Sequence, residues 1–268
     1  MVNIMKVNYA DAIPFSTLDW RGKAAVTIFF RGCPFRCLYC QNHPFLGEQR
    51  LVDLEFVEEQ IRNSRPFVSS VVFSGGEPLM QKAIIPLAEF SKELGLSVGI
   101  HTNGIYPNMA AELVKRNLVD KFFVDVKAPF DLPELYMKVA GLKNSEKPEK
   151  PEKNLEKNSE ELIEAIKKTI EIADSCCSEL ELRTTLIRGL IGNKQEIASL
   201  ATWISENVQN KEVIYVLQQG IPEHCLQVSL RKTQILEREE LYELGKTAKT
   251  FLKNVRIRTR EFGEEIVS

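Results

Sequence analysis

The chain alternates short apolar runs with longer stretches in which hydrophobic residues recur every three or four positions. The short runs are rich in Val, Ile and Phe, which is typical of buried strands, and the longer stretches are typical of amphipathic helices. The predicted strands are Val26–Phe30, Phe67–Phe73, Ser97–His101, Lys121–Val126, Leu180–Ile187, Val213–Leu217 and Val255–Ile257. The predicted helices are Asp53–Asn63, Leu87–Leu94, Asn108–Asn117, Glu160–Ser175, Lys194–Asn207 and Glu237–Leu252.

Strands that alternate with helices predict parallel βαβ units. About six units are too few for a closed eight-stranded barrel, so a partial barrel and an open doubly wound sheet both fit the pattern. One segment, at about 143–158, interrupts the rhythm with Lys, Glu and Pro and a single apolar residue, Leu155. We expect this segment to be a solvated, flexible insertion. The βα rhythm resumes after it, so residues 1–268 are predicted to form one domain.

Composition and charge exclude several function classes. The 268 residues carry 35 Lys and Arg against 37 Asp and Glu, a net charge of −2, which gives no sign of nucleic-acid binding through bulk positive charge. No run is apolar enough to span a bilayer, and the first 16 residues lack the apolar core of a signal peptide. The sequence therefore predicts a cytoplasmic protein with no membrane partner, whose six cysteines are thiols or metal ligands rather than disulfides.

Three cysteines form the most informative cluster in the chain. Cys33, Cys37 and Cys40 follow the first predicted strand with the spacing C-x3-C-x2-C, and the other three cysteines come much later. A structural zinc site closes with four ligands, and His43 could supply the fourth. A 4Fe–4S cluster held by three thiolates would instead leave one iron open for a small molecule. Of the remaining cysteines, the pair at the end of the 160–175 helix reads as half-buried thiols and Cys225 as a surface thiol.

Polar or glycine residues follow or occupy the next four strands. Ser74–Gly75–Gly76–Glu77–Pro78 ends the second strand, Thr102–Asn103–Gly104 the third, and Asp125 and Lys127 the fourth; Arg183 lies on the fifth. Each feature alone has an ordinary structural explanation, such as a turn or a rim ion pair. In parallel α/β architectures, however, ligands gather at the carboxyl ends of the strands. The joint placement predicts one site at that edge.

The cysteine spacing, with Tyr39 directly before Cys40, and the Gly75–Gly76–Glu77–Pro78 loop resemble the motifs of the radical S-adenosylmethionine enzymes. The resemblance implies a partial (β/α)6 TIM-type barrel in which Cys33, Cys37 and Cys40 hold a 4Fe–4S cluster. In that family the open iron chelates the amino and carboxylate groups of S-adenosylmethionine. An electron from the cluster then cleaves the sulfonium to methionine and a 5′-deoxyadenosyl radical.

The same resemblance implies roles for the other strand-end residues. Gly75, Gly76 and Glu77 are expected to grip the amino group of the cofactor, and Thr102 and Asn103 to border its site. Asp125 and Lys127 are expected beside its ribose and carboxylate, where they join the three cysteines as catalytic residues. Tyr39 would lie near the adenine. Apart from the resemblance, an arginine that points into a barrel needs an anionic partner, and a cofactor carboxylate would serve Arg183. For His101 the barrel interior and the pocket both stay open, with a core histidine favoured, and Trp20 is expected to be a packing residue.

Phe15–Lys23 and Cys40–Gln–Asn–His–Pro resemble the corresponding segments of the activating proteins of anaerobic ribonucleoside-triphosphate reductase, a group of glycyl-radical enzyme activating enzymes. Gln41 stands where that group usually has histidine. The resemblance implies hydrogen abstraction from a glycine of a partner enzyme, with flavodoxin or ferredoxin as the electron donor. Three alternatives stay open: activation of pyruvate formate-lyase or another glycyl-radical enzyme, a radical reaction on a small molecule such as a 7-deazaguanine precursor, and a non-enzymatic zinc protein.

Overall fold

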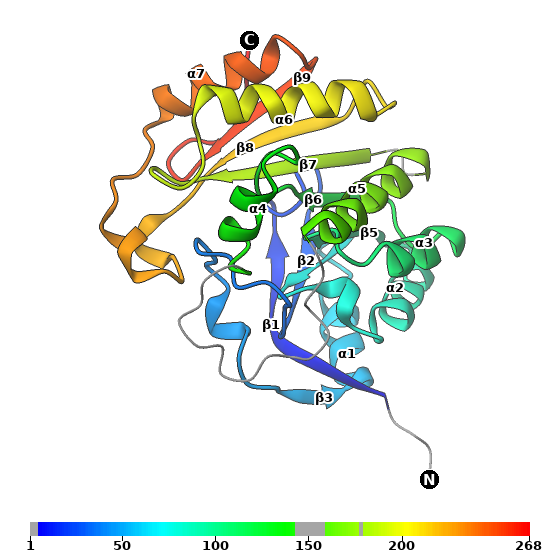
Figure 1. Ribbon diagram of the computed structural model, residues 1–268. Helices are drawn as coiled ribbons and strands as arrows, with labels where there is room; N and C mark the ends of the chain where they lie inside the picture. The colour runs from blue at the N-terminus through cyan, green and yellow to red at the C-terminus, as the bar shows by residue number, and fades with distance from the viewer. Residues whose placement is uncertain (1–4, 143–158, 177–178) are drawn as a thin grey trace.

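Seven parallel strands form the centre of the computed structural model, which describes residues 5–142, 159–176 and 179–268 (Figure 1). In spatial order they are β2 (Ala25–Phe30), β4 (Ser70–Gly75), β5 (Ser97–Thr102), β6 (Lys121–Asp125), β7 (Glu179–Leu186), β8 (Ile214–Gln219) and β9 (Asn254–Thr259). Antiparallel strands extend the sheet at both ends. These are β1 (Lys6–Ser16) and β3 (Leu51–Asp53) beyond β2, and β10 (Gly263–Ile266) beyond β9.

Helices follow the parallel strands and give six βα units in the described part of the chain. The helices of these units are α1 (Leu54–Ser64), α2 (Ile84–Glu93), α3 (Pro107–Lys115), α5 (Ser159–Cys176), α6 (Lys194–Asn207) and α7 (Arg238–Lys249), and a short α4 (Pro133–Val139) precedes α5. The strands succeed one another in sequence order without the reversal that defines a doubly wound sheet. The predicted partial (β/α)6 TIM-type barrel is therefore confirmed, and the open doubly wound alternative is wrong.

Several element boundaries differ from the prediction for identifiable reasons. Helix α2 begins at Ile84, three residues before the predicted start, because Pro86 lies in its first turn, where the missing N–H would have no helical partner. Strand β4 begins at Ser70 because Phe67 is 72% exposed. The sequence did not predict β1, whose pattern of apolar residues is broken by Asp11 and Pro14. The predicted insertion at 143–158 lies outside the described residues.

Two apolar clusters stabilise the barrel. The larger packs the outer face of the sheet against the helices, and the smaller one consists of Trp20, Ala25, Val72 and Phe123. Trp20 is 1% exposed, as expected for a packing residue, and stacks edge-on against Phe123. It lies so close to β5 that a Cβ on Gly99 would come within 2.9 Å of its ring. The loop before β2 thus closes the inside of the barrel at the end opposite the strand C-termini.

Among the described residues, no helix combines the length and the apolar character that crossing a membrane would need.

Candidate active site at the carboxyl ends of the strands

One cavity lies at the carboxyl ends of the parallel strands and collects residues from six of them. Of the twelve residues that the sequence singled out, all except Glu77 line it: Cys33, Cys37, Cys40, Tyr39, Gly75, Gly76, Thr102, Asn103, Asp125, Lys127 and Arg183. His101, Thr185 and Gln218 complete the wall on the β5, β7 and β8 side. The predicted convergence at one sheet edge is therefore present in the structure.

The loop that carries the three cysteines is held by backbone hydrogen bonds on both sides. Arg36 N donates to Ala140 O (3.0 Å) and Leu38 N to Val139 O (3.1 Å), which ties the loop to the end of α4. Gln227 N donates to Leu38 O (2.9 Å) from the segment after β8. A Cβ on Gly141 would lie 1.9 Å from Arg36 O, so only glycine allows this approach. Contacts with the end of α4 and with the segment after β8 thus hold the cysteine loop in place.

The three thiols face the cavity as free cysteines. Burial raises the pKa of each thiol, that of Cys37 to about 11, so they stay protonated until a cationic metal centre displaces the protons. Within the described ranges, no three His, Cys, Asp or Glu side chains converge as ligands of one metal ion. His43 lies in the turn His43–Phe45 and is not among the residues that line the cavity with the three thiols. An iron–sulfur cluster takes one thiolate on each of several irons, which suits three thiols around one cavity. The donor set fits a three-cysteine cluster better than zinc with His43.

The two glycines after β4 pack directly on the backbone that leaves β2. Gly75 has φ +101°, a conformation that L side chains rarely adopt. Gly76 N donates to Phe30 O (2.8 Å), and a Cβ on Gly76 would lie 2.0 Å from Gly32 O. The glycine pair therefore brings β4 and the start of the cysteine loop into contact.

Glu77 is fully buried, and its carboxylate does not line the cavity. Leu79 N (3.0 Å) and Thr102 Oγ1 (2.7 Å) donate to one carboxylate oxygen, and Asn103 N (2.8 Å) donates to the other. Burial raises the pKa of Glu77 to about 7, although these donors oppose the rise. The side chain shapes the Thr102–Asn103 turn, so the cavity face of the glycine loop is presented by Gly75 and Gly76.

Asp125 and Lys127 form an ion pair at the end of β6. Lys127 Nζ lies 2.8 Å from Asp125 Oδ2 and 5.8 Å from the centroid of the Tyr39 ring. Burial alone would lower the pKa of Lys127, but Asp125 and the nearby Tyr39 hold it well above its usual value. Lys127 is therefore a fixed cation that lines the cavity together with Asp125, whose side chain is 41% exposed.

Arg183 and His101 form the floor of the cavity, and sequence reasoning found only the first. Arg183 NH1 lies 3.3 Å from His101 Nε2, and His101 Nδ1 lies 3.2 Å from Ser74 Oγ. Glu181 lies beneath them and accepts a hydrogen bond from Arg183 Nε (2.6 Å). The alternation of side chains along a strand places residues 181 and 183 on the same face, and this was the available signal for Glu181.

Cys225 corrects one prediction. It is fully buried rather than a surface thiol, and its pKa is raised by burial. Cys40 is close enough to raise that pKa further, because the segment after β8 packs on the cysteine loop. Of the other two cysteines, Cys176 ends α5 and Cys177 lies outside the described residues.

The acid stability of the chain should depend on Glu181. Burial would raise its pKa, but Arg183, Lys121 and Arg258 together hold it well below 4.5, its ordinary value. As the pH falls, Glu181 of the unfolded chain binds a proton at a higher pH than Glu181 of the folded chain does. The ionised carboxylate therefore stabilises the fold above about pH 4.5, and this contribution is lost as the pH falls below that value. In denaturant titrations of the metal-free chain from pH 6 to pH 3, Glu181→Gln should flatten the pH dependence by about one proton. Equal slopes for the two proteins would contradict the assignment.

Comparisons with known proteins agree with this geometry. Residues 27–180 match the family model described as the Radical SAM superfamily. A protein of Methanocaldococcus jannaschii that carries the provisional name of a glycyl-radical enzyme activating enzyme is 31% identical, over 95% of this chain and 97% of its own length. The pyruvate formate-lyase-activating enzyme of Clostridium pasteurianum is 25% identical, over 84% and 90%.

A solved structure agrees with the fold. A radical SAM methyltransferase from Sphaerobacter thermophilus superimposes with a TM-score of 0.63 over 89% of this chain and 67% of its own, at 15% identity. At that identity the likeness concerns the fold alone. The family match and the full-length relative carry the assignment further: the chain is an enzyme of the radical S-adenosylmethionine superfamily and belongs to its glycyl-radical activating enzymes.

Proposed function

We propose that this chain activates a glycyl-radical enzyme and that it uses a 4Fe–4S cluster held by Cys33, Cys37 and Cys40. The partner that we propose first is an anaerobic ribonucleoside-triphosphate reductase. The observation that supports it is the convergence of three free thiols and the strand-end residues on one cavity. Similarity to an activating enzyme over nearly the whole of both chains supports it independently. The resemblance of the segment before β2 favours the reductase as partner.

When bound, the cluster supplies the electron that cleaves S-adenosylmethionine to a radical able to take hydrogen from a glycine. The residues of the chain would bind S-adenosylmethionine and orient it. The cation of Lys127, held by Asp125 Oδ2, would attract the carboxylate of the cofactor, and the other carboxylate oxygen of Asp125 would accept from a ribose hydroxyl. The backbone of Gly75 and Gly76 and the Thr102–Asn103 turn would border the methionine portion, while the Tyr39 ring faces Lys127.

Arg183 adds a specific sign that the cavity accepts an anion. Its NH2 is buried, and no hydrogen-bond partner for it occurs among the residues that the structure describes. A buried donor left without a partner costs about 1–3 kcal/mol, more when it is charged. A carboxylate in the cavity would satisfy it, which is the fit that we expect for S-adenosylmethionine.

The test is anaerobic reconstitution with iron and sulfide, followed by addition of S-adenosylmethionine, a reductant and the candidate partner. We expect a glycyl-radical EPR doublet with the reductase and equivalent formation of 5′-deoxyadenosine. The doublet should need a reduced flavodoxin or ferredoxin when no chemical reductant is present. Replacing the target glycine of the partner with alanine is the matched control and should remove the doublet.

Each alternative gives a different outcome. A doublet with pyruvate formate-lyase and none with the reductase would change the partner. Formation of 5′-deoxyadenosine with a 7-deazaguanine precursor and no protein partner would favour a small-molecule enzyme. About one zinc per chain with no iron or sulfide after anaerobic purification would refute the radical mechanism.

A further inference from the structure

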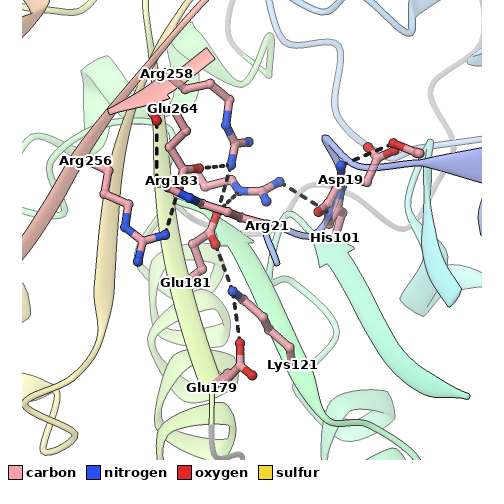
Figure 2. Close-up of polar contacts among 11 residues, drawn as sticks. Asp19, Arg21, His101, Lys121, Glu179, Glu181, Arg183, Arg256, Arg258 and Glu264 are labelled. Atoms are coloured by element: carbon pink, nitrogen blue, oxygen red, sulfur yellow. Dashed lines mark hydrogen bonds and ion pairs between the residues drawn. The ribbon is translucent and has the colours of Figure 1, made fainter. Parts of the chain in front are cut away.

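Below the cavity, Lys121, Glu181 and Arg183 are buried charged residues where a barrel of this type is usually filled with apolar side chains, and their ion pairs continue to the surface at Arg21 and Glu179. Five cations share three carboxylates there, in the part of the chain that the structure describes (Figure 2). The cations are Arg21, Lys121, Arg183, Arg256 and Arg258, and the carboxylates are Glu179, Glu181 and Glu264. We call these eight residues the floor network.

Glu181 is the most buried carboxylate of the floor network, with a side chain 1% exposed. Lys121 Nζ lies 3.0 Å from one of its oxygens, and Arg183 Nε (2.6 Å) and Arg258 NH2 (3.4 Å) share the other. Arg183 is the member of this group that also lines the cavity. Glu181 therefore connects the network to the ligand site through one guanidinium.

The guanidinium of Arg183 is fixed on three sides. Its Nε binds Glu181, its NH1 contacts His101, and its Cζ lies 4.3 Å from the centroid of the Phe123 ring. Burial and Arg183 hold the pKa of His101 well below its usual value, so the imidazole beside the guanidinium is neutral. His101 Nε2 lies 3.3 Å from both Arg183 NH1 and Asp19 O, and Nδ1 lies 3.2 Å from Ser74 Oγ, so the ring itself is held in place. NH2 has no hydrogen-bond partner in the part of the chain that the structure describes, and Figure 2 shows Arg183 between Glu181 and His101.

Three cations, Lys121, Arg183 and Arg258, surround the buried carboxylate of Glu181, and this local excess favours a negative charge in the cavity. Asp125 is the register neighbour of Arg183, but its carboxylate pairs with Lys127. We propose that Glu181 is a positioning residue that orients Arg183 so that NH2 binds the α-carboxylate of S-adenosylmethionine. This inference rests on the cofactor of the proposed function but not on the glycyl-radical partner, because it concerns cofactor binding alone.

Two ligands separate recognition of the carboxylate from recognition of the nucleoside. S-adenosylhomocysteine carries the amino acid portion, and 5′-methylthioadenosine lacks it. Titration calorimetry on the anaerobically reconstituted protein, at matched iron content, should show about a 10- to 100-fold loss of S-adenosylhomocysteine affinity in Arg183→Met. Glu181→Gln should lose about 10-fold, and both variants should bind 5′-methylthioadenosine within about twofold of the wild type.

The decisive measurement is the double variant Glu181→Gln/Arg183→Met. If Glu181 acts through Arg183, the double variant should bind S-adenosylhomocysteine as weakly as Arg183→Met alone. Glu265→Gln is the matched control, because Glu265 is a carboxylate on the terminal strand that also carries Glu264, and it pairs with Arg238 (2.6 Å), a residue outside the floor network. It should leave the preference between the two ligands unchanged.

Three results would overturn the proposal. They are additive losses in the double variant, an equal loss of both ligands in Glu181→Gln, and a wild-type protein that binds both ligands equally well. Should Glu181→Gln fold poorly, the variant Glu181→Gln/Lys121→Met removes both charges of a buried ion pair and so leaves no unpaired lysine. It should show the same loss of S-adenosylhomocysteine affinity, with 5′-methylthioadenosine binding unchanged. Absence of a glycyl radical with every candidate partner would contradict the proposed function and leave these affinities unaffected.

Discussion

Replacing Cys33, Cys37 or Cys40 with alanine is expected to abolish cluster binding and to lower S-adenosylmethionine cleavage by at least roughly 100-fold. Loss of an outer partner of a metal ligand already costs about 10- to 100-fold, and loss of a ligand itself should cost more. The three thiols line one cavity, and backbone hydrogen bonds hold the loop that carries them. When one thiol is removed, the other two therefore cannot move to take its place. Iron and sulfide content and the visible absorption of the reconstituted protein measure the first effect, and 5′-deoxyadenosine the second.

Cys225→Ala is the matched control for these variants. Cys225 is buried beside the cysteine loop, and its Sγ contacts Ile221 O at 3.6 Å, yet it does not line the cavity. It should keep the cluster and the cleavage activity. A cysteine variant of the loop that retained a full cluster, or a Cys225→Ala protein that lost it, would refute the ligand assignment.

Gly76→Ala is expected to destabilise the chain by more than about 3 kcal/mol and to prevent assembly of the site. The new Cβ would lie 2.0 Å from Gly32 O and 2.7 Å from the carbonyl carbon, and backbone atoms at the start of the cysteine loop cannot move as a flexible side chain can. The hydrogen bonds from Gly76 N to Phe30 O and from Glu77 N to Gly32 O should both weaken. Chemical denaturation and the yield of reconstituted cluster measure the two effects.

Gly47→Ala provides the comparison, because nothing lies within 4 Å of the Cβ that it would add. It should change stability by less than about 0.5 kcal/mol and leave cluster yield unchanged. A Gly76→Ala protein with the stability of Gly47→Ala would show that the contact between β4 and the cysteine loop does not constrain the site.

Periodicity along the chain predicted most of the barrel because each βα unit is encoded locally. The capping box at Asn193 and Glu196, for example, marks the start of α6 in the sequence itself. The strand β1 was missed because its apolar residues do not alternate regularly, and it is held in place by pairing with β2 and β3. Such pairing partners are far apart in the chain and leave no local signal.

Motifs predicted which residues share the cavity but not what each side chain does there. Glu77 illustrates the limit, since its buried carboxylate accepts hydrogen bonds from Thr102 and Asn103, contacts that depend on how β4 and β5 pack. Cys225 was misjudged because its burial depends on the segment after β8 folding back over the cysteine loop. Glu181 was overlooked because no motif marks it, although its spacing from Arg183 does.

The ion pair between Arg21 and Glu264 has a consequence for how the enzyme is made in the cell. It joins residues 243 positions apart, and the pairs of Glu264 with Arg256 and Arg258 complete the same network. Contacts of such long sequence separation form late in folding, because the loop that they close is entropically costly. The floor of the cavity therefore cannot be complete while the last strand is still in the ribosome.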